Sequence, residues 1–137
     1  MIVLDTNVLV SGLLSPYGPP GEIVRMVSSG ELKLYLDARV ITEYTEVLAR
    51  PRFSFNQDSV SALLDFISRT GRSIASSPLP APLPDTDDHP FLEIALAGKA
   101  AFLVTGNRAH FPAALCCGVN VVSPAEFMSA YGAERAT

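Results

Sequence analysis

The sequence has few cysteines and no long apolar run. Its two cysteines, Cys116 and Cys117, are adjacent, which favours reduced thiols over a disulfide framework or a metal site. No stretch reaches the roughly 18 uninterrupted apolar residues of a membrane span, and Asp5 interrupts the opening apolar run. We therefore expect neither a membrane segment nor an export signal. These absences predict a cytoplasmic protein.

An excess of basic residues is also missing, because the formal net charge is −4. Proteins that bind nucleic acid by neutralising phosphates usually carry more lysine and arginine than acid. The charge sign therefore argues mildly against a nucleic-acid enzyme. Two facts weaken that argument: a metal site itself needs clustered carboxylates, and eight of the ten basic residues are arginine, the better bidentate phosphate ligand.

What the sequence does contain indicates one globular domain. An apolar fraction of 48% with 18% charged residues excludes an intrinsically disordered chain. A chain of 137 residues is long enough to bury a core without disulfides. We therefore predict a single domain over residues 1–137.

Short apolar runs alternate with helical patterns along the chain. Strands are predicted at residues 2–4, 33–36, 72–76, 101–105 and 120–122. Helical segments are predicted at residues 6–14, 21–29, 37–50, 54–70 and 85–98, with the proline-rich residues 77–84 as an extended connector. This alternation is typical of a parallel sheet covered by helices on both faces. Ligands of such sheets bind at the carboxyl ends of the strands.

Three acidic residues fall where they can meet at that edge. Asp5 ends the first strand, Glu43 lies within the helix after the second, and Asp88 opens the helix before the fourth. Carboxylates brought together repel each other unless a cation binds them, and hard oxygen ligands select Mg²⁺ or Mn²⁺. A purely structural interpretation has equal weight from placement alone, because Asp5, Asp87 and Asp88 can cap helices and Glu43 can be solvated.

A family resemblance changes this balance. The strand followed by Asp5-Thr6-Asn7 resembles the first motif of the PIN-domain nucleases. Residues 40–48, 85–96 and 103–107 resemble the family's later motifs and occur in the same order. The resemblance covers essentially the whole chain. Residues 50–53 and 110–112 bring it closest to the VapC-like branch, the toxins of bacterial toxin–antitoxin pairs.

The resemblance implies a three-layer α/β/α sandwich with a central, mostly parallel five-stranded sheet. It matches Asp5, Glu43 and Asp88 to the family's metal-binding acids, so that the cofactor is one or two Mg²⁺ or Mn²⁺ ions. Asp88 is preferred to Asp87 because it lies seven residues before Ala95, as the family's acid lies before its helix alanine. Asp87 stays open as a substitute.

Other site residues follow from the same resemblance. At the family's fourth acidic position the chain has Asn107, which we include among the catalytic residues although it brings no charge, so the second metal site should be weaker. Arg39 lies one turn before Glu43, where it can meet a phosphate or form a salt bridge to Glu43. Substrate contacts are predicted for Thr6, Asn7, Arg39, Thr105 and Arg108.

The implied activity is Mg²⁺- or Mn²⁺-dependent endoribonuclease cleavage, in which a metal-activated water hydrolyses an RNA phosphodiester. The implied partners are an RNA substrate, a cognate antitoxin and a second copy of the chain. Such chemistry does not require His89 or His110. Glu93 lies about 140° around the helix from Asp88, so we expect it to point elsewhere. The alternative function is a PIN-like module that binds protein or RNA without cutting it.

Overall fold

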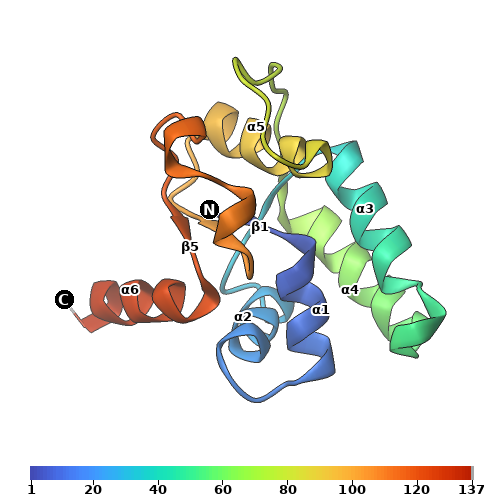
Figure 1. Cartoon of the computed structure of the whole chain (residues 1–137). Helices are drawn as coiled ribbons and strands as arrows, with labels where there is room; N and C mark the ends of the chain where they lie inside the picture. The colour runs from blue at the N-terminus through green and yellow to red at the C-terminus, as the bar shows by residue number, and fades with distance from the viewer. Residues whose placement is uncertain (137) are drawn as a thin grey trace.

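The protein is described here by a computed structural model that covers residues 1–136, with side chains through residue 133 (Figure 1). The single domain predicted for residues 1–137 includes Thr137, which lies outside the described residues. No helix in residues 1–136 is both long and apolar enough to cross a bilayer.

Five short parallel strands form the centre of the fold. A three-stranded sheet has the order β1-β4-β5, formed by β1 (Val3–Leu4), β4 (Leu103–Val104) and β5 (Val121–Val122). A second parallel pair consists of β2 (Tyr35–Leu36) and β3 (Arg72–Ser73). All five predicted strands are thus present, but each has only two residues, and an isolated bridge between Ile2 and Leu34 connects the two groups.

The central strands are apolar because both of their faces are covered. Val3, Leu4, Leu103 and Val104 are fully buried, so side chains on both sides of the pleat meet helices rather than water. Such strands show no polar alternation. Their short apolar runs were therefore the correct sequence signal for a buried parallel sheet.

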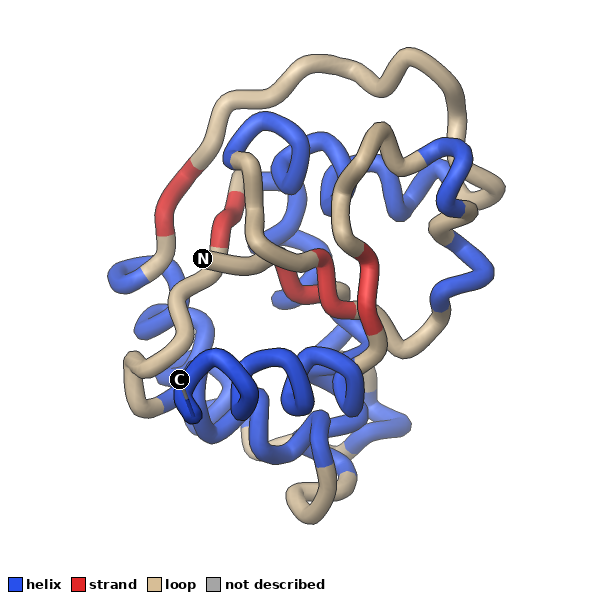
Figure 2. The backbone as a smooth tube through the Cα atoms, turned by 90° about the vertical axis from the view of Figure 1, so that its left-hand side faces the viewer, coloured by secondary structure: helices blue, strands red, loops and turns tan. Residues whose placement is uncertain are grey.

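Within residues 1–136, six α-helices surround these strands. They are α1 (Thr6–Leu14), α2 (Pro19–Ser28), α3 (Ala38–Leu48), α4 (Gln57–Thr70), α5 (His89–Gly98) and α6 (Pro124–Ala136). The helix α5 packs against β1, β2 and β4. On the opposite side of the sheet, α6 lies beside α2, so that the strands separate α5 from α6 in both views (Figures 1 and 2). This layering is that of the expected α/β sandwich.

The predicted start of α4 was three residues too early. Pro51–Phe53 form a short 3₁₀ turn, and Ser54 takes a left-handed conformation with φ of 52°. The helix begins only at Gln57, because the side chain of Asn56 accepts the backbone N–H of Ser59 at 2.9 Å and caps the helix there.

The helix α6 was absent from the sequence interpretation, although its start carries a clear signal. Ser123 and Glu126 form a capping box: the Glu126 N–H donates to Ser123 Oγ at 3.1 Å, and the Ser123 N–H donates to Glu126 Oε1 at 2.9 Å. Pro124 occupies the first helical position, where its missing N–H costs nothing.

The connector over residues 77–84 contains neither helix nor strand, as its prolines predicted. Two side chains of α5, His89 and Glu93, hold this connector in place. The Leu79 N–H donates to Glu93 Oε2 at 3.3 Å, and the Leu83 N–H donates to His89 Nε2 at 2.9 Å. Because Leu83 is buried, the segment enters the turn at Asp85 from a fixed position.

Candidate functional site

The carboxyl ends of β1 and β4 lead into a cleft of about 360 Å³. Two 3₁₀ turns, at Pro51–Phe53 and Thr86–Asp88, also reach it. The titratable and aromatic side chains that line it are Asp5, Glu43, Asp85, Asp87, Asp88, His110, Arg50, Arg52 and Phe53. The three predicted metal ligands therefore share one cavity.

Asp5 stands directly after β1 and is only 5% exposed. Its backbone N–H donates to the Val104 carbonyl, which fixes the residue against β4. Its Oδ2 accepts a hydrogen bond of 2.8 Å from the hydroxyl of Thr105 at the end of β4. Burial raises the pKa of Asp5, although the Thr105 hydroxyl and the nearby backbone amides of Asn7 and Thr6 oppose that rise.

Glu43 projects from the middle of α3 into the same cleft. Its Oε2 accepts a hydrogen bond from the hydroxyl of Thr6. The next residue, Tyr44, is fully buried, and its hydroxyl donates to the Leu4 carbonyl at 2.5 Å, which ties α3 to the end of β1. Burial raises the pKa of Glu43, and the charges of Asp5 and Asp87 add to that rise.

Asp88 closes the 3₁₀ turn that precedes α5 and is 8% exposed, whereas Asp87 is exposed. The Oδ2 atom of Asp88 is buried without a hydrogen-bond partner. His110 Nδ1 lies 3.0 Å from it, but the contact does not have hydrogen-bond geometry. Burial, reinforced by the charge of Asp5, raises the pKa of Asp88 to about 6. Among the described residues, this buried carboxylate thus has no hydrogen-bond donor for Oδ2, and the charge of His110 offsets only part of the rise in its pKa.

Asp85 and His110 join Asp88 in a second cluster. One ligand atom from each of the three lies within 4.8 Å of the others. The sequence interpretation did not include Asp85 in the site, although it begins the same acidic run, and it gave His110 no role. Asp88 and His110 lie 22 positions apart, which is no recognisable ligand spacing, so only the folded chain brings them together.

The carboxylates of the cleft, taken together with the neighbouring imidazole of His110, fit a divalent cation. Among the described residues, no lysine or arginine forms an ion pair with Asp5, Glu43 or Asp88. All three carboxyl groups have raised pKa values, chiefly because they are buried, and the charges of neighbouring acids add to the rise at Glu43 and Asp88. Carboxylate oxygens suit Mg²⁺ and Mn²⁺, and an imidazole beside them shifts the preference toward Mn²⁺.

Thr6 and Asn7 line this cleft, while Thr105 lies behind it. Asn7 Oδ1 accepts the Gly106 N–H at 3.0 Å, which links the start of α1 to the loop after β4. Thr105 is fully buried, so its hydroxyl orients Asp5 instead of facing a substrate. This differs from the predicted substrate contact.

Three other predicted site residues lie elsewhere. Arg39 pairs with Asp37 at 2.7 Å and with Glu93 at 2.6 Å, which replaces the expected salt bridge to Glu43. Arg108 pairs with Glu126 at 3.0 Å. Asn107 is exposed outside the cleft lining, and its backbone N–H donates to Thr105 Oγ1.

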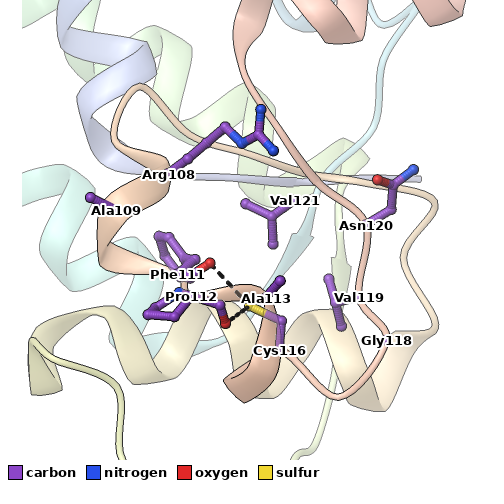
Figure 3. Close-up of a pocket in the computed structure, with 10 residues that line it drawn as sticks. All are labelled: Arg108, Ala109, Phe111, Pro112, Ala113, Cys116, Gly118, Val119, Asn120 and Val121. Atoms are coloured by element: carbon purple, nitrogen blue, oxygen red, sulfur yellow. Dashed lines mark hydrogen bonds between the residues drawn. The ribbon is translucent and has the colours of Figure 1, made fainter.

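Arg108 instead borders a separate hollow of about 800 Å³ beside β5 (Figure 3). Its lining combines apolar side chains such as Phe111 and Val121 with Asn120 and contains no carboxylate. Cys116 Sγ donates to the carbonyls of Phe111 and Pro112, at 3.5 and 3.3 Å, and is held by them (Figure 3). This hollow is larger than the acidic cleft, but it lacks metal-binding chemistry.

Comparison with known proteins identifies the fold and its usual chemistry. A family model described as PIN domain matches residues 1–109, a range that contains every carboxylate of the cleft. The uncharacterized protein MJ1680 of Methanocaldococcus jannaschii is 26% identical over 110 residues, which cover 78% of this chain and 70% of that protein. PIN domains are generally metal-dependent nucleases. This chain belongs to the PIN domain family.

Proposed function

We propose that this protein is a divalent-metal-dependent endoribonuclease in which Asp5, Glu43 and Asp88 bind the cation. The observation that carries the proposal is the buried Oδ2 of Asp88, which accepts no hydrogen bond from any described residue, in a cleft that it shares with Asp5 and Glu43. A carboxylate in that position is costly to the fold unless an ion compensates it. Family membership supplies the class of reaction.

Each residue of the cleft then has a definable task. Thr105 and Thr6 donate hydrogen bonds that orient Asp5 and Glu43. Tyr44 fixes α3 against β1 through its hydrogen bond to the Leu4 carbonyl. When bound, a divalent cation supplies a Lewis acid that activates water and offsets charge on the phosphodiester. Asp85 and His110 are placed to assist a second cation that shares Asp88, the role first expected of Asn107.

The test is cleavage of a mixed-sequence single-stranded RNA with Mg²⁺, with Mn²⁺ and with EDTA. We expect cleavage by the parent protein that requires metal, and none by Asp5→Asn. Asp87→Asn is the matched control, because Asp87 is an exposed acid in the same cleft and should retain most of the activity. Metal-independent cleavage, or equal loss in both variants, would contradict the ligand assignment.

We further propose that the protein is the cytoplasmic toxin of a toxin–antitoxin pair and forms a homodimer. The support is the resemblance of residues 50–53 and 110–112 to that branch of the family. Induced expression in a bacterial host should arrest growth, and Asp5→Asn should relieve the arrest. If growth is unimpaired although the soluble protein cleaves RNA, the nuclease proposal stands and the toxin proposal is wrong.

A catalytically inactive PIN-like module is the second candidate function. The position of Asn107 outside the cleft favours it, because the residue at the family's fourth acidic position then contributes neither a charge nor a side chain to the cleft. The two functions differ in one measurement. A nuclease should gain melting temperature and activity together when Mn²⁺ is added, whereas an inactive module should bind RNA without cutting it under any metal.

A further inference from the structure

One wall of the acidic cleft is basic and aromatic. Arg50, Arg52 and Phe53 line the cleft together with the carboxylates. Arg50 lies close enough to Glu43 for its charge to lower the pKa of that carboxyl group, against the larger effect of burial. A phosphate held by this wall would therefore lie beside the metal-binding acids.

The side chains of Arg50 and Arg52 have no ion-pair partner among the described residues, in contrast to those of Arg39 and Arg108. Both are exposed. Their guanidinium groups thus have free donors at the edge of a cleft whose net charge is negative, where an arginine would be expected to pair unless it serves a ligand.

Arg52 and Phe53 form a stack. The guanidinium carbon of Arg52 lies 4.8 Å from the centroid of the Phe53 ring. Phe53 in turn stacks on Phe55, with 5.4 Å between centroids and 18° between planes. One face of the Arg52 guanidinium is thereby covered by an aromatic ring, while the residue as a whole is exposed.

The backbone holds this stack rigidly. Pro51 begins the 3₁₀ turn, where its ring fixes φ. The Phe53 N–H donates to the Arg50 carbonyl, and the Ser54 N–H donates to the Pro51 carbonyl, both at 3.1 Å. The turn therefore fixes the backbone positions from which Arg52 and Phe53 project, which reduces the entropic cost of stacking a further ring there.

We infer that Arg50, Arg52 and Phe53 form a nucleotide subsite, in which an unpaired base stacks on the Arg52 guanidinium and Arg50 binds an adjacent phosphate. Guanidinium planes and aromatic rings are the usual platforms for splayed bases of single-stranded nucleic acid. Phosphate contacts alone would not need the supporting phenylalanine rings. The inference rests on the proposed nuclease function, because it places the base beside the cleaving site.

The experiment measures binding, so that it does not depend on cleavage. The background is Asp5→Asn, and the probes are a fluorescein-labelled single-stranded RNA and the same strand with abasic sugars. Arg52→Lys keeps the charge and removes the plane, so it should weaken binding of the RNA about fivefold or more and leave the abasic strand unchanged. Phe53→Leu should do the same. Arg50→Ala should weaken both probes equally and reduce the salt dependence of binding by about one phosphate contact.

The matched control is a second pair of the same chemistry. The guanidinium carbon of Arg69 lies 6.0 Å from the Phe66 ring, on α4 and outside the cleft lining. Arg69→Lys should change neither probe. Melting temperatures show that each variant is folded.

The subsite is overturned if Arg52→Lys binds RNA as tightly as its parent, or if it weakens RNA and abasic strand equally. Strong binding of a protein partner that depends on Arg52, without any effect on RNA, would also overturn it. Failure of the nuclease proposal looks different: the parent would then not cleave under any metal, while plane-dependent binding of bases persists.

Discussion

Two buried carboxylates, five residues apart, lie just before α5 and within it, and their surroundings differ. Glu93 is 7% exposed and receives hydrogen bonds from Arg39 and from the Leu79 N–H. Asp88 is 8% exposed and has an Oδ2 without any hydrogen-bond partner. The first carboxylate is neutralised by the chain itself and holds a connector in place. The second has only His110 beside it, with Nδ1 at 3.0 Å but no hydrogen bond to Oδ2 from any described residue, and a buried acid with so perturbed a pKa is typical of a functional site.

The largest expected effect separates the two carboxylates by activity. Asp88→Asn should reduce metal-dependent RNA cleavage by about 100-fold or more, because it removes a ligand charge at the centre of the cleft. Glu93→Gln should leave cleavage within about threefold, since the amide can still accept a hydrogen bond from Arg39. Initial rates at saturating Mn²⁺ measure both. Equal losses would mean that the two carboxylates do not differ in function.

The next largest effect concerns stability, for which Glu93 and its partner Arg39 should matter more than they do for activity. Arg39→Ala leaves Glu93 buried without its cation, so the free energy of unfolding should fall by about 2 kcal/mol after allowance for the half-exposed arginine. Arg108→Ala is the control, because its partner Glu126 is half exposed and an exposed pair contributes much less to stability. Urea denaturation measures both variants. A larger loss for Arg108→Ala would contradict this ranking.

Asp88 should make the metal-free protein less stable as the pH rises. Its pKa is about 6 in the fold, above the value of about 3.9 in an unfolded chain. The penalty is therefore absent below about pH 4 and complete above about pH 6. Asp88→Asn should exceed the parent by about 1 to 2 kcal/mol at pH 7, and the difference should vanish at pH 4.

Mn²⁺ provides the complementary measurement. At pH 7 it should raise the melting temperature of the parent, because binding to the folded state relieves the repulsion among the acids. The same ion should have little effect on Asp88→Asn. A pH-independent difference between the two proteins, without response to Mn²⁺, would show that Asp88 has no special role in stability.

The smallest effect concerns the hydrogen bond between Tyr44 and the Leu4 carbonyl, which fixes α3 beside the site. Tyr44→Phe leaves the buried Leu4 carbonyl without its donor, which should cost about 1 kcal/mol. Because Tyr44 also positions Glu43, the affinity for Mn²⁺ should fall by roughly tenfold. Titration calorimetry distinguishes this from a purely structural effect. Thr45→Val on the exposed face of α3 should change neither quantity.

The sequence predicted the strands and most helices because their signals are local. An apolar run ending at Asp5 and a capping residue such as Asp37 act within a few residues of themselves. The missed helix α6 also had a local signal, the Ser123–Glu126 capping box. The early start assigned to α4 arose because the Asn56 cap was overlooked.

The site was less predictable because it depends on distant pairings. Arg39 was placed near Glu43 by helical spacing, but the folded chain offers Glu93, 54 residues away, as a better partner. His110 approaches Asp88 only through the turn after β4. Conversely, Arg108 pairs with Glu126 on the helix that the sequence interpretation had missed. No spacing rule within one element could have given these contacts.

The pairing of β1 with β4 has a consequence for how the protein is made. Val3 and Leu103 are register partners, and the hydroxyl that orients Asp5 belongs to Thr105, 100 residues further along the chain. Asp5 therefore leaves the ribosome long before its support has been synthesised. A nascent chain that has not reached β4 has neither the parallel sheet nor the closed cleft. If the protein cleaves RNA, its nuclease centre thus cannot assemble until translation has passed Thr105.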